Sequence, residues 1–357
     1  MNSPPDVRPD PTWNPAAVAA TQRYLRAAAK LTDRTFWPVL MHVNTNLFLW
    51  HLDAFAKNED PVPLFVSAFD AATRVFETAS AGICQGLFPA DPGANADEFE
   101  EKVTGLFSDV WVAMTDDIYF DQAHAFTCER LEKNGIDPKG LFAGKVVIDA
   151  GCGSGKFSAA IARLGARKVI GVDLGAKGLE FARAQAAKTN YADKLEFRHG
   201  SLLDMPVADS VADVVWSNGV IHHTLGYETC VQEFARVLKP GGTLFLYVNG
   251  RFGLFELLQD SLRTANQFVP RTLFQQFLQL LGVNPGRLYW MMDCLYAPYE
   301  WRRGSDVVSL LTDSGFSNIV QLKRGVATDQ IEQITTGLPF ASVKYGEGQL
   351  KYLAVKG

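Results

Sequence analysis

The amino-acid sequence predicts an α/β fold in which a doubly wound parallel sheet carries helices on both faces. Two observations predict the sheet. Short apolar runs alternate with amphipathic stretches from Lys145 onward, and a glycine-rich turn joins the first run to the stretch that follows. A third observation predicts added helices, because residues 1–95 and 251–303 are largely helical in pattern and stand outside this alternation.

Composition indicates a folded protein with small-molecule partners. The chain has 357 residues, more than one typical domain, with 47% hydrophobic and 20% charged residues. Its formal net charge of -5 gives no general electrostatic reason to bind nucleic acid, so nucleic acid is not an expected partner. The five cysteines form no close pairs, so neither a disulfide framework nor a zinc site is indicated.

No membrane association is expected. The start of the chain, MNSPPDVRPDP, has prolines and aspartates where a leader would have a basic region followed by an apolar run. No stretch reaches the roughly 18 consecutive apolar residues that a membrane span needs. We therefore expect a cytoplasmic protein.

The amino-terminal part has the pattern of packed helices. Apolar groups recur at three- and four-residue spacing in AAVAATQRYLRAAAKL and again in PLFVSAFDAATRVFETA. The segment PADPGANADE, residues 89–98, has the composition of a connector. We therefore place a boundary near residue 95, between an N-terminal helical region (1–95) and a second domain (96–357) that contains the insertion 251–303.

The alternation defines the elements of the second domain in order. The expected strands cover residues 145–151, 168–174, 194–201, 212–218, 241–250, 318–325 and 349–357. The expected helices cover residues 157–165, 176–188, 229–239 and 305–316. Because helices alternate with strands, the strands should run parallel, with helices on both faces of the sheet.

A glycine-rich loop follows the first predicted strand and opens the next helix. In VVIDAGCGSGKF, Gly151, Gly153 and Gly155 permit a tight turn and let a cofactor approach the backbone and the helix amides. A dinucleotide fingerprint would need glycine at Lys156, and a phosphate-binding P-loop would need Ser or Thr at Phe157. The remaining interpretations are a plain glycine-rich turn and a site for a different cofactor.

Acidic residues mark the ends of the first two predicted strands. Asp149 precedes the glycine loop and Asp173 ends KVIGVDL, so the order is strand, acid, GxGxG, helix, strand, acid. This order, with GSLLDMP, NGVIHH and RVLKPGG downstream, resembles the class I, Rossmann-like S-adenosylmethionine-dependent methyltransferases, and within them the methyltransferase type 11 group. The resemblance covers residues 141–250 closely and the tail from 305 loosely. It implies methyl transfer, S-adenosylmethionine as the cofactor, and a mostly parallel sheet with an antiparallel last strand.

The resemblance also implies how the cofactor is held. Asp149 and the glycine loop would approach its methionine part, and Asp173 would accept hydrogen bonds from both ribose hydroxyls. As an alternative, Asp173 is a helix N-cap. The family commonly places an acid opposite the adenine amine, and Asp204 is the candidate substitute here. The further residues implied for the cofactor site are Tyr119, Leu174, Ser201, Leu202, Asn218 and Gly219.

Two adjacent histidines follow the fourth predicted strand, at the edge where ligands of open α/β sheets bind. Methyl transfer is an in-line displacement that requires aligned donor and acceptor, and a hydroxyl acceptor must also lose a proton. Histidine titrates near neutrality, so His222 and His223 are the candidate general bases. Alternatively, they pack against the cofactor or bond a backbone group. No metal is required in principle.

The insertion 251–303 connects the fifth predicted strand to the next helix, so it should overhang the same edge. Its aromatic side chains with few polar groups are typical of acceptor pockets. The same pattern suits plain core or a contact in a homo-oligomer. The candidate acceptor residues are Tyr289, Trp290, Asp293, Tyr296, Tyr299 and Trp301. We expect the insertion and the N-terminal helices to form one helical cap over this edge.

Three functions remain open on the sequence alone. The leading one is methyl transfer to a small-molecule acceptor at an oxygen, nitrogen, sulfur or carbon atom. A protein or RNA methyltransferase would use the N-terminal helices to hold the macromolecule, and the acidic net charge argues against RNA. A non-catalytic cofactor-binding protein would have no physical need for the intact glycines and both acids.

Overall fold

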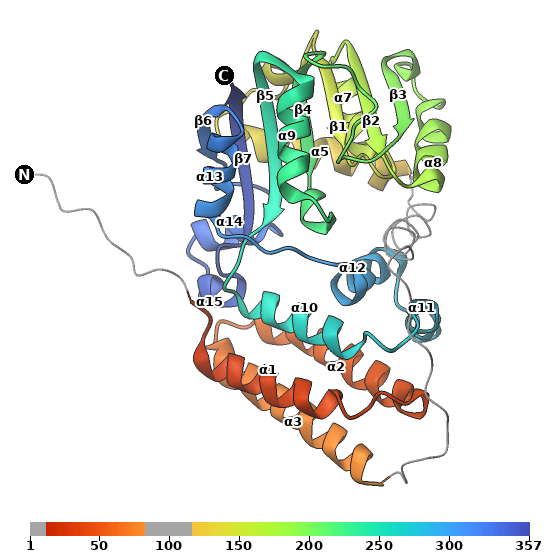
Figure 1. The fold of residues 1–357 in the computed structure, drawn as a ribbon, viewed down its shortest axis with the longest axis vertical. Coiled ribbons are helices and arrows are strands. Elements are labelled where there is room, and N and C mark those ends of the chain that lie inside the picture. The colour runs from red at the N-terminus through yellow and green to blue at the C-terminus, as the bar shows by residue number, and fades with distance from the viewer. Residues whose placement is uncertain (1–11, 83–115) are drawn as a thin grey trace, which may run out of the picture.

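The computed structural model describes residues 12–82 and 116–357, which form a sheet half and a helical half. Figure 1 shows the two halves stacked, with the carboxyl ends of the parallel strands facing the helices. The boundary predicted near residue 95 lies outside the described residues.

Seven strands form one sheet in the order β3-β2-β1-β4-β5-β7-β6. The strands are β1 (Val146–Ala150), β2 (Lys168–Asp173), β3 (Leu195–His199), β4 (Ala212–Asn218), β5 (Leu238–Asn249), β6 (Phe316–Gln321) and β7 (Gln349–Lys356). Neighbours from β3 to β5 pair in parallel, whereas β7 pairs antiparallel with both β5 and β6. The doubly wound order and the antiparallel last strand confirm the predicted fold class.

Helices cover both faces of this sheet. The helical segments of residues 117–237 and 304–345 are η2 (Asp117–Gln122), α5 (Ala123–Glu132), α6 (Pro138–Phe142), α7 (Lys156–Arg163), α8 (Ala176–Ala186), η3 (Ala192–Lys194), η4 (Ile221–His223), α9 (Tyr227–Val237), α13 (Gly304–Asp313), α14 (Gln330–Thr335) and α15 (Ala341–Tyr345). In β1, Val147 packs with residues of α5, α6 and α7, and Ile148 packs with α9 and α13. All five residues of this strand are buried, and all are apolar except Asp149.

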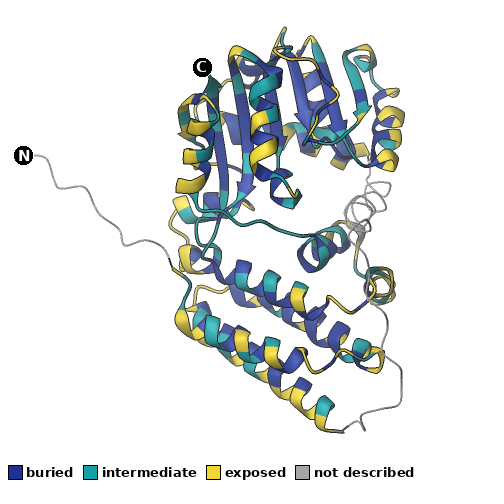
Figure 2. Cartoon of the chain, viewed as in Figure 1, coloured by how far each residue is buried: buried dark blue, intermediate teal, exposed yellow. Residues whose placement is uncertain are grey.

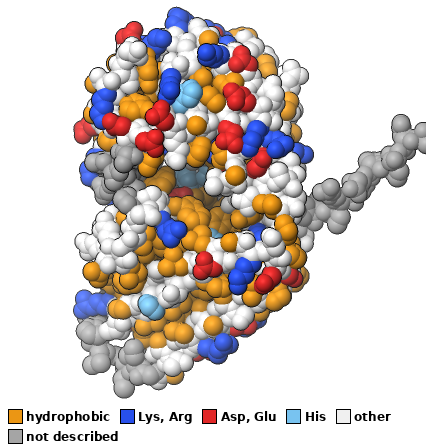
Figure 3. All heavy atoms as spheres, turned by 180° about the vertical axis from the view of Figure 1, so that it is seen from behind, with side chains coloured by type: hydrophobic (Ala, Val, Ile, Leu, Met, Phe, Trp, Pro, Cys, Tyr) orange, Lys and Arg blue, Asp and Glu red, His pale blue; other side chains and the backbone are white. Residues whose placement is uncertain are grey.

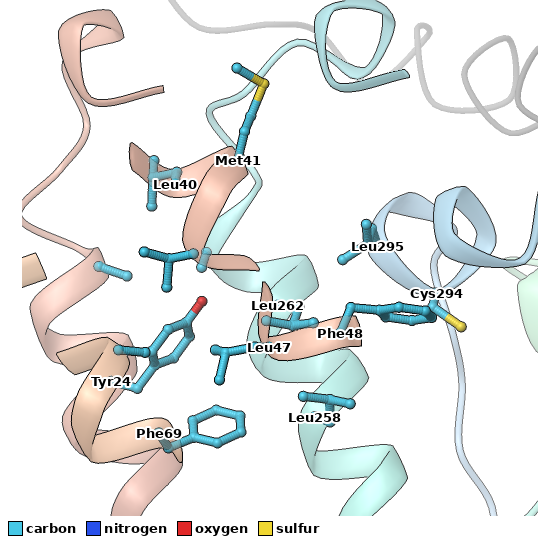
Figure 4. Packing of buried hydrophobic residues seen from close by; sticks show 14 of the residues in the cluster. Tyr24, Leu40, Met41, Leu47, Phe48, Phe69, Leu258, Leu262, Cys294 and Leu295 are labelled. Carbon is cyan, nitrogen blue, oxygen red and sulfur yellow. The ribbon is translucent and has the colours of Figure 1, made fainter. Parts of the chain in front are cut away.

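The helical half joins segments from two distant parts of the chain. It contains α1 (Pro15–Ala28), η1 (Arg34–Phe36), α2 (Trp37–Ala56), α3 (Pro61–Gly82), α10 (Leu254–Ala265), α11 (Arg271–Leu280) and α12 (Pro285–Tyr296). These helices share one hydrophobic core, to which Tyr24, Phe48, Phe69, Leu258 and Leu295 belong (Figure 4). Exposed residues lie on the outer faces of α1 and α3 (Figure 2).

Local sequence fixes where these helices begin. The side chain of Asn14 accepts the N–H groups of Ala16 and Ala17 at 3.0 and 3.3 Å, with Pro15 as the first residue of α1. Asn284 caps α12 in the same way by accepting the N–H of Arg287 at 2.9 Å. Within the described residues, no helix combines the length and the apolar character needed to cross a membrane.

The common core of the helical half confirms that the N-terminal helices and the insertion form one unit, with one correction. Residues of α12 line the cleft described below, whereas no described residue of α1, α2 or α3 does. The N-terminal helices therefore support the cap from beneath and do not cover the site. The helices α14 and α15 lie between β6 and β7, where the sequence pattern predicted no element.

Candidate active site

A cleft of about 350 Å³ opens at the carboxyl ends of β1 and β4, where the strand order changes direction. Its volume lies within the usual range of small-molecule pockets. Figure 3 shows a hollow between the two halves of the molecule, with hydrophobic side chains along its lower side. Its walls come from the glycine loop, the ends of β2, β4 and β5, the η4 turn, and the insertion.

The glycine loop forms one wall of the cleft. Gly151 has a φ of +78°, and a Cβ atom there would come within 2.4 Å of the Val220 side chain. Gly153 also lines the cleft, but Gly155 does not. A Cβ on Gly155 would lie 2.8 Å from that of Ala182, so this glycine permits close packing against α8. Two of the three predicted glycines therefore line the cleft, and the third permits close helix packing.

Asp173 lines the cleft and also holds the loop. Its Oδ2 accepts the N–H of Gly153 at 2.8 Å, and its Oδ1 accepts the N–H of Gly175 at 2.7 Å. Each carboxylate oxygen has a second lone pair, which remains for a ligand. Burial raises the pKa of Asp173, and the two N–H donors oppose this effect. The N-cap of α8 is Gly175, so the alternative role of Asp173 as N-cap is wrong.

Two residues that the resemblance implies for the donor do not line the cleft. Asp149 is 2% exposed, and its Oδ2 accepts a hydrogen bond from Ser158 Oγ at 2.6 Å. Burial raises the pKa of Asp149 to about 7. Tyr119 is fully buried, and its hydroxyl donates to the backbone oxygen of Ser154 at 2.8 Å. Both side chains support the glycine loop instead of facing the cleft.

The side of the cleft predicted for adenine is apolar. Leu174, Ser201 and Leu202 line it, and Ser201 Oγ accepts the backbone N–H of Leu203 at 3.1 Å. Asp204 is exposed and does not line the cleft, so it does not replace the missing acid. The flanking leucines offer the flat apolar contacts that a purine ring requires.

His222 lines the cleft, as the sequence predicted. It is 2% exposed, and its Nε2 lies 3.4 Å from Nδ2 of Asn249. Its Nδ1 has no hydrogen-bond partner among the described residues. Burial lowers the pKa of His222 well below its ordinary value, and the neighbouring His223 adds to this shift. The imidazole is therefore neutral at pH 7.

His223 also lines the cleft and is better arranged to accept a proton. Its Nδ1 lies 2.8 Å from the backbone oxygen of Pro298, and because a carbonyl only accepts, Nδ1 carries the hydrogen. In the neutral ring Nε2 then has the lone pair, and it lies 3.8 Å from Oδ1 of Asp293. Burial lowers the pKa of His223, and the charge of Asp293 opposes this shift. Asp293 would stabilise the ring once Nε2 is protonated.

The insertion forms the wall that faces the histidines. Tyr289, Asp293 and Tyr299 line the cleft. The Tyr299 hydroxyl donates to Asp293 Oδ2 at 2.7 Å, and its ring stacks on His222 with centroids 5.1 Å apart. The N–H of Glu300 also donates to the backbone oxygen of His222 at 2.7 Å. These contacts fix the insertion against the η4 turn.

Three aromatic residues predicted for the acceptor pocket lie outside the cleft. Trp290 packs against the core of the helical half. The Tyr296 hydroxyl donates to the backbone oxygen of Val269 at 3.2 Å, and Trp301 Nε1 donates to Asp260 Oδ1 at 2.9 Å. Their side chains anchor the insertion, because helical packing turns them away from the sheet edge.

Sequence reasoning missed Lys156, Tyr247 and Asn249, which all line the cleft. Tyr247 and Asn249 lie at the carboxyl end of β5, and that position was the available signal. Lys156 is the first residue of α7, directly after the glycine loop. In the sequence, this lysine only excludes a dinucleotide fingerprint.

Comparison with known proteins identifies the domain that holds this cleft. Residues 148–246 match the family described as Methyltransferase domain. These residues form a class I methyltransferase domain. The match confirms the resemblance that the glycine loop and the two acids predicted, together with S-adenosylmethionine as the cofactor of the domain.

Two curated relatives share about a third of their aligned residues with this chain. The 27-O-demethylrifamycin SV methyltransferase of Amycolatopsis mediterranei is 30% identical over 153 residues, which are 41% of this chain and 56% of that protein. The malonyl-[acyl-carrier protein] O-methyltransferase of Pectobacterium atrosepticum is 31% identical over 142 residues, 38% of this chain and 53% of that protein. The chain thus spans about half the length of these relatives.

Among solved structures, the geranyl diphosphate C-methyltransferase of Streptomyces coelicolor is 17% identical to this chain, with a TM-score of 0.44. The comparison covers 74% of this chain and 98% of that one.

The residues of the methyltransferase domain fit S-adenosylmethionine. Asp173 has lone pairs for the ribose hydroxyls, and Leu174 and Leu202 flank the adenine side. The side-chain oxygen of Asn218, which lines the cleft, is buried without a hydrogen-bond partner among the described residues. A buried acceptor of this kind requires a donor, and the ammonium group of the cofactor is one.

Proposed function

We propose that the protein transfers a methyl group from S-adenosylmethionine to a hydroxyl oxygen of a small-molecule acceptor. The pair formed by His223 and Asp293 is the observation that carries this proposal, because it places a proton acceptor and a stabilising charge on the cleft wall. The cleft volume of about 350 Å³ suits a small acceptor. The names of the two relatives, both methyltransferases of oxygen atoms, support the choice of oxygen.

In this reaction the chain moves a proton while the cofactor supplies a methyl group bound to a sulfonium centre. His223 Nε2 takes the hydroxyl proton as the new carbon–oxygen bond forms. Asp293 stabilises the resulting imidazolium, and the hydrogen bond from Tyr299 holds Asp293 in place. Pro298 fixes the ring orientation through Nδ1. The wall of the insertion keeps water from the reacting atoms.

The test is single-turnover methylation by a His223→Asn protein, with tritium-labelled cofactor and catechol and 4-hydroxybenzoate as probe acceptors. Asparagine can keep a donor for the Pro298 oxygen, but it has no atom in place of Nε2. We expect the rate to fall by about a hundred- to ten-thousandfold with nearly unchanged S-adenosylhomocysteine affinity. The exposed His42, replaced by asparagine, is the matched control.

The pH profile gives a second readout of the same role. Because burial lowers the pKa of His223, the wild-type rate should be constant above pH about 6.5 and fall as the pH drops through the lowered pKa. A His223→Asn protein with the full rate at every pH would overturn the base role. No product from either probe or from an aliphatic alcohol, with cofactor binding intact, would overturn the assignment to hydroxyl acceptors.

A further inference from the structure

Lys156 is a positive charge in the cleft that the proposed reaction leaves without a role. It follows Gly155, begins α7 and lines the cleft beside Gly151 and Gly153. Among the described residues its ammonium group has no hydrogen bond and no ion pair. Its recorded contact is with the ring of Phe157, whose centroid lies 5.3 Å from Nζ.

The two acids among the described residues that line the cleft, Asp173 and Asp293, form no ion pair with this lysine. Both oxygens of Asp173 accept backbone N–H groups, and Asp293 accepts the hydroxyl of Tyr299. Arg130, whose charge adds to the shift of the Lys156 pKa, is itself paired with Asp329 at 2.7 Å. Of the described residues that line the cleft, Lys156 is the sole lysine or arginine.

An ammonium group that is taken out of water without a counter-ion is unfavourable. Burial accordingly lowers the pKa of Lys156 to about 8, and Arg130 contributes less. At pH 7 the group remains mostly protonated. A carboxylate delivered into the cleft would therefore gain a charge-assisted hydrogen bond and would relieve the cost of the buried charge.

We propose that Lys156 binds the carboxylate of the methionyl part of S-adenosylmethionine. The inference rests on the proposed function for the identity of the donor. The methionyl group carries a carboxylate and an ammonium. Of the described residues that line the cleft, Lys156 offers a cation without a counter-ion, and Asn218 and Asp293 each offer a buried oxygen without a hydrogen bond. The amino end of α7 adds a partial positive charge on the same side as Lys156.

The experiment compares two ligands that differ in the methionyl group. S-adenosylhomocysteine contains this group, whereas 5′-methylthioadenosine has the same adenosine and thioether without the amino acid. Calorimetry is carried out with the wild type, Lys156→Met, Lys156→Arg, and Lys139→Met as a control at an exposed lysine. Methionine keeps the length of the side chain and removes its charge.

The affinity of Lys156→Met for S-adenosylhomocysteine should fall about 10- to 100-fold, because this is the change in affinity expected when one hydrogen bond between charged groups is lost. Its affinity for 5′-methylthioadenosine should change less than about twofold, and Lys156→Arg should recover most of the loss because it restores the charge. Lys139→Met should bind both ligands as the wild type does.

Equal losses for both ligands would overturn the proposal, because they would show a merely structural role. Unchanged affinity of Lys156→Met for both ligands would also overturn it. If Lys156→Met lost only the rate of 4-hydroxybenzoate methylation, Lys156 would be assigned to a carboxylate of the acceptor instead. A wild type that binds neither ligand would contradict the proposed function itself. The two failures are therefore distinguishable.

Discussion

The glycine loop, Asp173, Leu174, Ser201 and Leu202 form one wall of the cleft, here called the donor wall. This wall and the helical half differ in how far along the chain their contacts reach. In the donor wall, Gly153 bonds Asp173, which is 20 residues away. In the helical half, Nδ2 of Asn44 donates to Oδ1 of Asn266, which is 222 residues away. Sequence patterns carry information about neighbours along the chain, so they predict the first kind of site better than the second.

The two halves also differ in how completely they satisfy a buried acid. Burial raises the pKa of both Asp149 and Glu256 to about 7. In the sheet half, Asp149 is held by the Ser158 hydroxyl. In the helical half, Glu256 Oε2 accepts Trp13 Nε1 at 3.0 Å and also the N–H of Phe252. Its Oε1 has no hydrogen bond among the described residues and lies 3.5 Å from Nε of Arg251, whose charge partly offsets that of the acid.

Removing a core side chain of the helical half should give the largest effect. Phe48 is fully buried, and its ring contacts Trp290 of the insertion with centroids 5.1 Å apart. We expect Phe48→Ala to reduce the free energy of unfolding by about 3–5 kcal/mol, measured by urea denaturation. The folded protein should still bind S-adenosylhomocysteine, because no residue of α2 lines the cleft among those described.

The matched control for Phe48 is Val75→Ala on α3, where the side chain is 47% exposed. It should change the free energy of unfolding by less than about 0.5 kcal/mol. A Phe48→Ala protein that remains folded but loses S-adenosylhomocysteine binding would show that the donor wall depends on the helical half. That result would contradict the view that the donor wall is built from local contacts alone.

Neutralising the buried acid should give a smaller and pH-dependent effect. The pKa of Glu256 is raised from 4.5 to about 7 by burial, so the folded protein holds this proton more tightly than the unfolded chain. The contribution of this group to stability is present below pH 4.5 and is lost as the pH rises through about 7. We expect Glu256→Gln to exceed the wild type by up to about 3 kcal/mol at pH 8 and to match it at pH 4.

Thermal and urea unfolding from pH 4 to 8 measure this difference, with Glu59→Gln at an exposed position as the control. Glutamine keeps an oxygen for Trp13 and for the N–H of Phe252. A constant difference between Glu256→Gln and the wild type at every pH would show that Glu256 does not titrate between these values, and the contrast with Asp149 would have to be given up.

A single methyl group in the glycine loop should give the smallest effect, seen mainly in donor affinity. Gly151 and Gly144 have nearly the same φ, +78° and +72°, but a Cβ meets Val220 only at Gly151. Alanine at either site should cost about 1–2 kcal/mol of stability. Only Gly151→Ala should weaken S-adenosylhomocysteine binding, by about tenfold or more, because Val220 must move. Equal affinities of the two variants by calorimetry would argue against this wall as the donor site.

Much of the donor wall was predictable because each of its parts follows a strand. Gly151, Gly153, Asp173, Leu174, Ser201 and Leu202 line the cleft as predicted. Asp149 and Tyr119 do not line the cleft, because a motif gives the position along the chain and not the direction of a side chain. Asp149 points to Ser158, and Tyr119 points to the loop backbone.

The sequence by itself determined the seven strands, the helices that alternate with them up to α13, the glycine loop, the acid at the end of β2 and the pair of histidines at the sheet edge. These features depend on periodicity, on backbone freedom at glycine and on the fixed place of a strand end. Only the tertiary structure decided that Asp293 lies beside His223, that Tyr296 and Trp301 turn away from the cleft, and that Lys156 faces it. Those outcomes depend on how distant helices pack. An aromatic face of a helix can line a pocket or join a core, and the sequence does not show which of the two it packs against.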